Sequence, residues 1–519
     1  MRAAHGVGKV RAAEGALMAT VAEGALMQRA AFGLASVCAR VLGGTYGARV
    51  VVLTGSGDNG GDALYAGAML ARRGARVHAV TAGSRTHEGG AAALRGAGGR
   101  LAGPDDDAVP GLIDEADLIL DGMLGIGGKG GLREPYAGLA ARAARSGAVV
   151  VAVDLPSGID ADTGELPGPA LQADLTVTFG TWKPGLLVDP GAGRAGLAEL
   201  VDIGLGPYLD APDLLALQSA DVAGLLPMPS AESDKYRRGV LGVVAGSERF
   251  TGAAWLAVGA AIHGGAGMVR LVSAGRPAAI VRQSWPEAVI TVIEDAGPEP
   301  ADVLRTAGRV QAWTAGPGMG TGDDAAGLLA EVLASDVPVL IDADGLTLVA
   351  AERGLLPRRA PTLLTPHAGE LARLLGADRD DVEARRLEHV RRAAAELGAT
   401  VLLKGSTTVI ATAEAGAPVH VNATGTPWLA TAGSGDVLSG LAGSLLAQGL
   451  GPVDAAACAA YLHGLAARLA AAGQPGPGSG PQGDGSPDDV DVSAEAPIGA
   501  SDVLRALPVA IRSVHAAAG

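Results

Sequence analysis

The sequence predicts an α/β protein with two consecutive domains, each built around a parallel β-sheet. The chain has 519 residues, which is too long for one ordinary domain. In both halves, short apolar runs alternate with helical stretches, an order typical of parallel strands covered by helices on both faces. Between residues 203 and 239 this alternation stops in a segment rich in proline and glycine. We therefore predict a boundary near residues 210–220 and domains of residues 1–215 and 216–519.

The first half opens with a helical stretch, residues 10–42, and alternates between strands and helices from Arg49 onward. Its predicted strands are residues 50–53, 77–81, 118–120, 149–153 and 175–179. This order predicts a Rossmann-like, doubly wound sheet whose ligands bind at the carboxyl ends of the strands. The predicted strands of the second half are residues 240–245, 268–272, 289–293, 312–314, 339–341, 362–364 and 401–403. Near the end we predict a flexible insertion at residues 473–487 and a closing helix at residues 500–508.

Composition narrows the class of protein. The net charge of -15 argues against binding to nucleic acid or to an anionic membrane, so we expect neither partner. Cys38 and Cys458 each lie in an apolar helical run, as buried thiols do in a reducing compartment. We find neither a leader peptide nor an apolar span long enough for a bilayer. We expect a cytoplasmic protein, and a homo-oligomer whose number of copies the sequence does not give.

The first strand runs into the loop GSGDNGGD, which contains a literal GxGxxG at Gly55, Gly57 and Gly60. A dinucleotide fingerprint also needs an acidic residue at the end of the second strand, and that strand ends in Val80 and Thr81. The acidic residues Asp58 and Asp62 would moreover repel a pyrophosphate. The loop is better suited to a cation, or to sugar hydroxyls and amides.

Oxygen-bearing side chains follow three strand ends of the first half. Asn59, Asp121 and Ser157 come from successive carboxyl ends of one predicted sheet. Each alone is more typical of a turn, but together they can converge on one hard cation. Asp154 lies at the same strand exit as Ser157, and a glycine-rich loop at residues 125–131 follows Asp121.

In the second half, Gly433-Ser434-Gly435 directly precedes Asp436 and an apolar, helix-period run. Backbone N–H groups at such a turn can receive a phosphate or a developing oxyanion, with Asp436 beside them as a base. The alternative is an ordinary helix N-cap. The positive end of a helix favours a nearby anion by only about 0.3–1 kcal/mol. The position of Asp436 beside the anion-binding amides, and not the helix dipole, must therefore make it an effective base. Asn422, the turn at residues 424–427 and KGSTT at residues 404–408 fall where they could face the same pocket.

With these motifs, the second half resembles the ribokinase-like superfamily, and within it the ADP-dependent NAD(P)H-hydrate dehydratases. GPGMG at residues 316–320, TPHAGE at residues 365–370, KGSTT and GSGD occur in the order typical of that group. The resemblance implies that Ala253, Gly318 and His367 contact the substrate and that Asp436 acts on its hydroxyl. Without the resemblance, His367 would more often be interpreted as a helix cap. His263, inside an alanine-rich helix, is interpreted as a structural residue with no role in the site. The residues implied to hold ADP or AMP are Lys404, Gly405, Ser406, Thr407, Thr408 and Gly435.

The first half, from about residue 10 to residue 185, resembles an NAD(P)H-hydrate epimerase domain. The resemblance implies a potassium ion on Asn59, Asp121 and Ser157, and Asp154 at the substrate as acid/base group. The residues implied to contact the hydrated nucleotide are Asp58, Asn59, Gly60, Gly61, Asp62, Gly125, Ile126, Gly127, Gly128, Lys129, Gly130, Gly131 and Asp154. Lys183 is either a helper or an exposed lysine. The chain departs from the family in having Asp58 where Asn is common and Ala63 where Gly is usual.

Together the resemblances imply a bifunctional metabolite-repair enzyme for NADH and NADPH hydrates. The first domain would interconvert the R and S hydrates, and the second would dehydrate the S form with ADP and Mg²⁺, giving AMP and phosphate. One alternative is a small-molecule kinase of the same superfamily, which leaves the first half unexplained. Another is a scaffold whose first domain only binds partners, but a scaffold has no need of a cation pocket.

Overall fold

The computed structural model describes residues 1–293, 299–473 and 495–517. Contacts divide the chain into two compact units, which we describe separately. The N-terminal unit is Ala3–Leu214, and the C-terminal unit is Leu215–Gly519 together with Met1–Arg2. β1 (Arg2–Ala4) and β9 (Leu214–Ala216) lie at these borders. Most of the predicted insertion at residues 473–487 lies outside the described residues.

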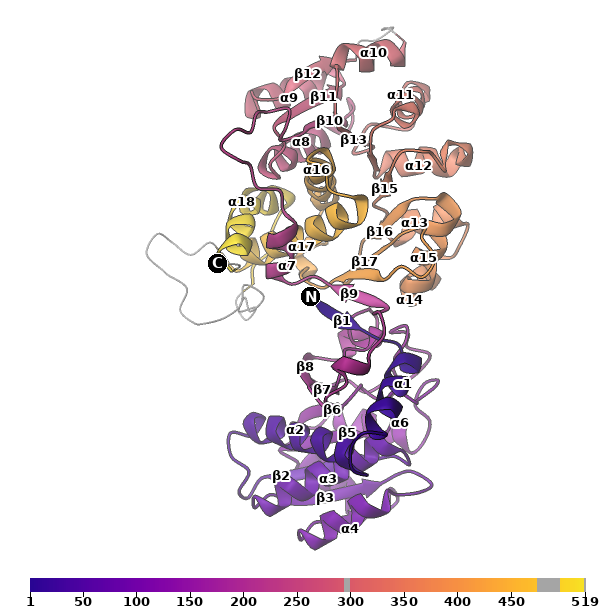
Figure 1. The fold of residues 1–519 in the computed structure, drawn as a ribbon, viewed down its shortest axis with the longest axis vertical. Coiled ribbons are helices and arrows are strands. Elements are labelled where there is room, and N and C mark those ends of the chain that lie inside the picture. Colours follow the sequence, from indigo (N-terminus) through magenta and orange to yellow (C-terminus); the bar gives the residue numbers. More distant parts are fainter. Residues whose placement is uncertain (294–298, 474–494, 518–519) are drawn as a thin grey trace. The chain divides into compact units, whose positions relative to one another are not determined.

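The N-terminal unit is a doubly wound parallel sheet, drawn in indigo to magenta in Figure 1. Its strands lie in the order β4-β3-β2-β5-β6-β7-β8, and every neighbouring pair is parallel. They are β2 (Arg49–Thr54), β3 (Arg76–Thr81), β4 (Arg100–Ala102), β5 (Leu118–Gly122), β6 (Val149–Val153), β7 (Leu175–Phe179) and β8 (Leu197–Val201). β2 lies inside the sheet, and both of its faces are buried. Its continuous apolar run fits that position.

Helices cover both faces of this sheet and build two separate cores. One core takes side chains from α1 (Val7–Met18), α2 (Ala25–Val41), α3 (Asp58–Arg72) and α4 (Glu88–Gly96), and the other from α5 (Val109–Asp114) and α6 (Tyr136–Ala143). The 3₁₀ turns are η1 (Pro184–Leu186), η2 (Ala192–Arg194) and η3 (Gly206–Tyr208). The predicted continuous helix at residues 10–42 is wrong, because α1 ends at Met18 and a turn with Gly24 at φ 77° precedes α2.

The C-terminal unit is also an α/β structure. Its strands lie in the order β18-β17-β16-β15-β14-β13-β10-β11-β12, parallel from β12 to β16 and antiparallel from β16 to β18. They are β10 (Val240–Val244), β11 (Met268–Ser273), β12 (Val289–Val292), β13 (Ala312–Ala315), β14 (Val339–Ile341), β15 (Thr362–Leu364), β16 (Thr400–Leu403), β17 (Thr408–Ala411) and β18 (Val419–Asn422). The predicted fold class of two α/β domains on parallel sheets is confirmed.

The helices of this unit surround the sheet. They are α7 (Ser219–Leu225), α8 (Thr251–His263), α9 (Gly275–Ser284), α10 (Pro300–Ala307), α11 (Asp323–Ala334), α12 (Asp344–Ala351), α13 (Ala368–Leu375), α14 (Arg379–Ala384), α15 (Arg386–Leu397), α16 (Ser434–Ala447), α17 (Pro452–Ala471) and α18 (Ala500–Ala516), with 3₁₀ turns η4 (Arg353–Leu355) and η5 (Pro427–Leu429). The closing helix α18 extends past the predicted end at Pro508, which lies inside it.

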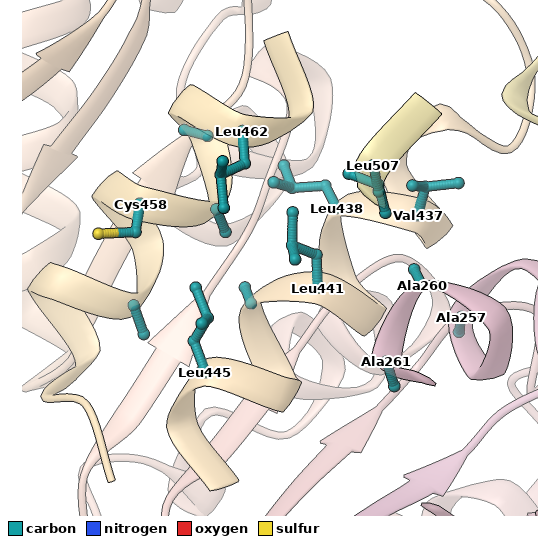
Figure 2. Packing of buried hydrophobic residues seen from close by; sticks show 14 of the residues in the cluster. Ala257, Ala260, Ala261, Val437, Leu438, Leu441, Leu445, Cys458, Leu462 and Leu507 are labelled. Atoms are coloured by element: carbon teal, nitrogen blue, oxygen red, sulfur yellow. The ribbon is translucent and has the colours of Figure 1, made fainter. Parts of the chain in front are cut away.

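The main core of the C-terminal unit lies around α16, and Figure 2 shows its side chains beside those of α8, α17 and α18. Small residues allow α8 and α16 to approach closely. A Cβ added at Gly440 would collide with the Ala257 carbonyl.

Cys38 and Cys458 are both buried as free thiols, as predicted, and burial raises the pKa of each to about 12. Within the described part of the chain, no helix combines the length and apolar character needed to cross a bilayer.

Candidate active sites

The Asp436 carboxylate lies in the first turn of α16, near the carboxyl ends of the parallel strands. The helix begins at Ser434, and its N-cap is Gly433 at φ 88°, a left-handed conformation that glycine adopts without strain. Asp436 therefore does not cap the helix, and its side chain forms no hydrogen bond or ion pair with the described residues. The Asp436 N–H donates to the Gly433 carbonyl at 3.1 Å, whereas the Gly435 N–H meets no acceptor among those residues. This leaves a free amide next to a free carboxylate.

A buried ion pair lies beside Asp436. Lys404 Nζ is 2.8 Å from Asp342 Oδ1, and the Ser439 hydroxyl donates to Asp342 Oδ2 at 2.7 Å. Asp342 is 1% exposed, and Lys404 Nζ also lies 3.8 Å from Glu370 Oε2. A Cβ built on Gly435 would lie 3.4 Å from Lys404 Nζ, so the ammonium group adjoins the free amide. Of the predicted residues, the fold thus brings together Lys404, Gly435 and Asp436.

The pKa shifts of Asp436 and Lys404 give these two side chains different roles. Burial raises the pKa of Asp436 to about 7, and the Asp342 carboxylate raises it further against the opposing effect of Lys404. For Lys404, burial alone favours the neutral amine, but the carboxylates of Asp342 and Glu370 outweigh it and raise its pKa. Lys404 therefore stays a cation, while Asp436 titrates near neutrality. A carboxyl group with such a pKa is suited to general acid–base work.

His463 on α17 is a neighbour that sequence reasoning missed. It is buried, its Nε2 donates to the Ser434 carbonyl at 2.9 Å, and burial lowers its pKa to about 4. The neutral ring thereby holds the first turn of α16 without adding charge. It lies in an alanine-rich helix with no motif around it, so the sequence offered no signal.

The predicted substrate contacts are partly adjacent in the fold. A Cβ on Gly318 would lie 2.9 Å from the Ala253 Cβ, so these two residues touch. His367 is the N-cap of α13, where its Nδ1 accepts from the Gly369 N–H at 3.0 Å. That bond places the ring proton on Nε2 and leaves it as a donor, since the side chain is 61% exposed. The cap and the substrate contact are therefore compatible at His367.

The loop at residues 404–408 is supported from behind by a second residue that the sequence did not reveal. The buried Arg386 donates through Nη2 to the carbonyls of Lys404 and Thr407, at 3.0 and 2.9 Å. Gly405 and Ser406 are exposed at the tip, and Thr407 is buried.

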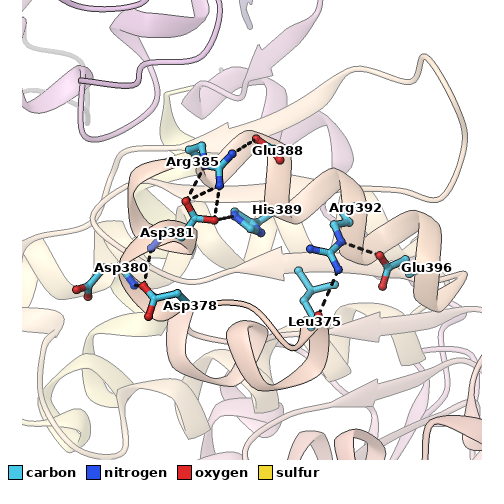
Figure 3. A network of polar contacts seen from close by, with 9 residues as sticks. All are labelled: Leu375, Asp378, Asp380, Asp381, Arg385, Glu388, His389, Arg392 and Glu396. Carbon is cyan, nitrogen blue, oxygen red and sulfur yellow. Dashed lines mark hydrogen bonds and ion pairs between the residues drawn. The ribbon is translucent and has the colours of Figure 1, made fainter. Parts of the chain in front are cut away.

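Figure 3 shows the neighbouring ion-pair network, in which Asp381 accepts from Arg385 and from His389 Nε2 at 2.9 Å. This network fixes the start of α15, where Arg386 lies.

The N-terminal unit contains a cavity of about 1050 Å³ at the carboxyl end of its sheet. Helix α1, the turn before α2, the start of α3 and the loop after β5 contribute to its walls. The predicted residues that line it are Asp58, Asn59, Asp62, Gly125, Ile126, Gly127, Gly128 and Asp154. The remaining predicted contacts, Gly60, Gly61, Lys129, Gly130 and Gly131, are not part of its lining. Gly60 packs against the Gly55 carbonyl and Gly131 against Gly168, so these glycines serve the close approach of loops.

The three predicted cation ligands lie in one neighbourhood. The Ser157 N–H and hydroxyl donate to the two Asp121 carboxylate oxygens at 2.8 and 2.7 Å. The Asn59 amide lies against Gly125, and its buried Nδ2 has no partner in the described residues. Burial raises the pKa of Asp121 to about 6, and no basic side chain offsets it there. A fully buried carboxylate, an unengaged amide and a hydroxyl form a donor set that fits a hard monovalent cation.

Asp154 and Lys183 form a second buried aspartate–lysine pair. Asp154 has a positive φ of 66°, and its Oδ1 accepts from Lys183 Nζ, from the Thr178 hydroxyl at 3.0 Å and from the Phe179 N–H at 3.1 Å. Lys183 is 1% exposed, so its interpretation as an exposed lysine is wrong. It also donates to the Phe179 carbonyl at 2.9 Å. Lys183 thus fixes the Asp154 side chain at the cavity.

Fold and sites together define a two-domain α/β protein with ionisable side chains gathered at the carboxyl end of each sheet. Residues 23–185 match the family model described as YjeF-related protein N-terminus, and residues 241–479 match the one described as NAD(P)H-hydrate dehydratase. The bifunctional NAD(P)H-hydrate repair enzyme Nnr of Mycobacterium leprae (strain TN) is 48% identical over 488 residues, covering 93% of this chain and 96% of the relative. The chain belongs to the family of bifunctional NAD(P)H-hydrate repair enzymes, and the resemblance of both halves is confirmed.

A second relative and a solved structure are also similar to this chain. The enzyme of the same name from Mycobacterium tuberculosis (strain CDC 1551 / Oshkosh) is 49% identical over 464 residues, covering 88% of this chain and 92% of the relative. The solved ADP/ATP-dependent NAD(P)H-hydrate dehydratase from Bacillus subtilis, co-crystallized with ATP/Mg²⁺, is 29% identical with a TM-score of 0.48, covering 57% of this chain and 97% of that chain.

The Lys183–Asp154 pair predicts a stability effect. We expect Lys183→Met to destabilise the N-terminal unit by about 3–5 kcal/mol, because it leaves a buried carboxylate without its cation. In scanning calorimetry the melting temperature of that unit should fall by roughly 6–20 °C, since 1 kcal/mol is worth roughly 2–4 °C at this size. Adding Asp154→Asn to Lys183→Met should recover part of the loss. Lys129→Met removes an exposed lysine and serves as control, and an equal effect there would contradict the role of the buried pair.

Proposed function

We propose that residues 1–215 interconvert the R and S hydrates of NADH and NADPH, and that residues 216–519 dehydrate the S hydrate with ADP, giving AMP and phosphate. The observation that carries this proposal is the free Asp436 carboxylate beside the free Gly435 amide and the Lys404 ammonium group. Family membership supplies the substrate class.

In the C-terminal site, Asp436 is proposed to take the proton of the substrate hydroxyl. Hydroxide is a poor leaving group, so transfer of the ADP phosphoryl group to that oxygen lets phosphate leave in its place. The Gly435 amide and Lys404 would stabilise the charge on the transferred group. Ala253, Gly318 and the His367 Nε2–H are proposed to contact the hydrated nucleotide, while residues 404–408 hold ADP.

Magnesium is proposed to arrive with the ADP phosphates. Asp342 is committed to Lys404 and Ser439, and the Gly320 N–H donates to Asp344 at 2.9 Å. The described residues contain no cluster of three acidic, histidine or cysteine side chains suited to a metal ion. When bound, the ion would neutralise phosphate charge, with the phosphates themselves as its main ligands.

In the N-terminal site, Asp154 is proposed to act on the hydrate as an acid/base group. The nucleotide is proposed to bind along the start of α3 and the loop at residues 125–131. Asn59, Asp121 and Ser157 are proposed to hold K⁺, which supplies the positive charge that the buried Asp121 lacks. We further propose that the protein is cytoplasmic, in keeping with its buried free thiols. We also propose that it forms a homo-oligomer.

Replacing Asp436 tests the dehydration step. With an R and S mixture of NADH hydrate and ADP, we expect Asp436→Asn to lower recovery of dihydronicotinamide absorbance by at least about 10²-fold, the usual worth of a positioned base. The parent rate should rise with pH through about 7, because only the ionised carboxylate accepts a proton. Ser434→Ala, which keeps the backbone, is the control for folding of the turn. A stable phosphorylated product would instead indicate a kinase.

The same carboxylate affects stability. The pKa of Asp436 is about 7 in the folded protein, above the ordinary value of 3.8, so its contribution to stability falls as pH rises between these values. We expect Asp436→Asn to raise the melting temperature of the C-terminal unit at pH 8 and to leave it nearly unchanged at pH 4.

Replacing Asp154 tests the epimerisation step. With the hydrate mixture and ADP, Asp154→Asn should consume the S epimer at the parent rate and leave the R epimer to its slow spontaneous epimerisation. Chromatographic separation of the epimers over time measures this. The control is Asp160→Asn, a turn aspartate outside the cavity lining. Rapid consumption of both epimers by Asp154→Asn would remove Asp154 from the reaction.

The cation proposal has a separate readout in stability. We expect KCl to raise the melting temperature of the N-terminal unit above that in choline chloride at equal ionic strength, because K⁺ binds only the folded site. Asp121→Asn should abolish this difference, while Asp117→Asn, which alters an exposed aspartate just before β5, should keep it. An equal response to both salts in the parent would contradict the site.

A further inference from the structure

The cavity of the N-terminal unit contains more carboxyl groups than the proposed reaction has used. Helix α1 presents Arg11, Glu14 and Met18 to it, spaced by three and four residues along one face. Asp58 and Asp62 enter from α3, and Asp154 from the end of β6. Neither Arg11 nor Glu14 belongs to a motif that the sequence analysis used.

Helix α1 is held firmly beside the segment that carries Lys183. The His5 N–H donates to the Trp182 carbonyl at 2.9 Å, and His5 Nδ1 lies 2.7 Å from the Thr181 hydroxyl. Asp162 and Asp213 accept from the backbone N–H groups of Val7 and Gly6 at the start of the helix. Val10, Ala13 and Leu17 are buried in the same core as Phe179. The adjacent stripe of α1, including Glu14, is thereby fixed over the cavity.

Glu14 is half-buried, and within the described residues it makes no hydrogen bond or ion pair. Burial raises its pKa, and the neighbouring Asp154 and Asp58 raise it further, while Lys183 and Arg11 oppose them. Asp154, by contrast, is fixed in its ion pair with Lys183. The cavity thus holds Asp154, fixed by Lys183, together with Glu14, whose carboxyl group has no partner among the described residues.

Inversion of the hydrate requires chemistry on both faces of the ring. The hydroxyl is on C6, next to the ring nitrogen N1, because water adds where the protonated enamine carries positive charge. If the C6–O bond breaks, the N1 lone pair forms an N1=C6 double bond and the ring becomes planar at C6. Water that adds to the opposite face then gives the other epimer. One group must protonate the leaving oxygen, and another must deprotonate the incoming water.

We propose that Glu14 is a second catalytic acid/base residue of the N-terminal site, acting on the face of the nicotinamide ring opposite Asp154. In one direction the Glu14 carboxyl gives its proton to the C6 hydroxyl, the C6–O bond breaks, and water leaves with the bonding pair. A second water attacks C6 from the other face, its proton goes to the Asp154 carboxylate, and the N1=C6 π pair returns to N1. The reverse direction exchanges the two roles. One water leaves and one enters, no redox change occurs, and the inference rests on the proposed epimerase function.

Asp62 also lines the cavity and makes no hydrogen bond or ion pair with the described residues, but its surroundings suit a different role. Burial and the charges of Asp154, Asp58 and Glu14 raise its pKa well above the ordinary value. The shift favours its protonated form, which can donate a hydrogen bond to the substrate. Glu14 is the carboxyl group that the firmly held helix α1 presents to the cavity.

The experiment uses the full chain, the R epimer of NADH hydrate, no ADP, and H₂¹⁸O as solvent. The parent should form the S epimer with one ¹⁸O incorporated per inversion. Glu14→Gln should lower kcat for inversion by about 10²-fold or more with KM changed by less than about threefold, and Glu14→Asp should recover part of the rate. The matched control Glu115→Gln alters an exposed glutamate outside the cavity and should behave like the parent.

Dehydration of the S epimer with ADP by the same variants reports whether each chain is folded and active in its other domain. Inversion by Glu14→Gln at the parent rate would overturn the role of Glu14, and an S epimer without ¹⁸O would overturn the loss and return of water. A parent that dehydrates but does not invert the R epimer would instead refute the proposed epimerase function. If Glu14→Gln does not fold, the inversion rate of Glu14→Asp decides: a lowered rate with intact dehydration supports the inference, and a rate equal to that of the parent overturns it.

Discussion

Both sites depend on a buried aspartate–lysine pair at the carboxyl edge of a parallel sheet. Asp342 with Lys404, and Asp154 with Lys183, place a carboxylate and an ammonium group together at largely buried positions, although 21% of the Lys404 side chain stays exposed. Such pairs add little net stability, because desolvation costs about as much as the attraction returns. Their value lies in position. Each lysine reaches its aspartate from a separate segment, so the pair fixes the distance between loops that the sheet alone leaves undefined.

A fixed pair also determines what the neighbouring carboxyl groups can do. Asp342 keeps Lys404 charged, and the same negative charge helps to raise the pKa of Asp436 to about 7. In the N-terminal cavity, Asp154 raises the pKa of Glu14 and of Asp62. In each domain a carboxylate fixed by a lysine thus raises the pKa of a carboxyl group beside it. Such tuning by neighbouring charges is a usual basis of acid–base catalysis in enzymes.

The sequence predicted the sheets well, because buried parallel strands appear as short apolar runs such as residues 50–53. It missed β4 and β8, short strands at the two edges of the N-terminal sheet, whose exposed residues interrupt the apolar pattern. At the sites it found residues in glycine-rich motifs, such as Asn59, Asp154 and Asp436. It missed Glu14, Arg386 and His463, because each lies in a helix of ordinary composition and acts through a tertiary contact. It also left Lys183 undecided, since burial of a lysine depends on a partner 29 residues away.

The placement of Asp436 depends on the smallest residues of the chain. Helix α16 lies directly on α8, where Gly440 meets the Ala257 carbonyl, and Gly443 packs against the Thr314 hydroxyl of β13. Any side chain at these two positions would push α16 away from the sheet. The first turn of α16 would then carry Gly435 and Asp436 away from Lys404, which is anchored at the end of β16. A core poor in aromatic residues and rich in alanine and glycine is therefore more than a compositional bias in this domain. It sets the depth at which the helix lies, and that depth brings the amide, the carboxylate and the ammonium group together.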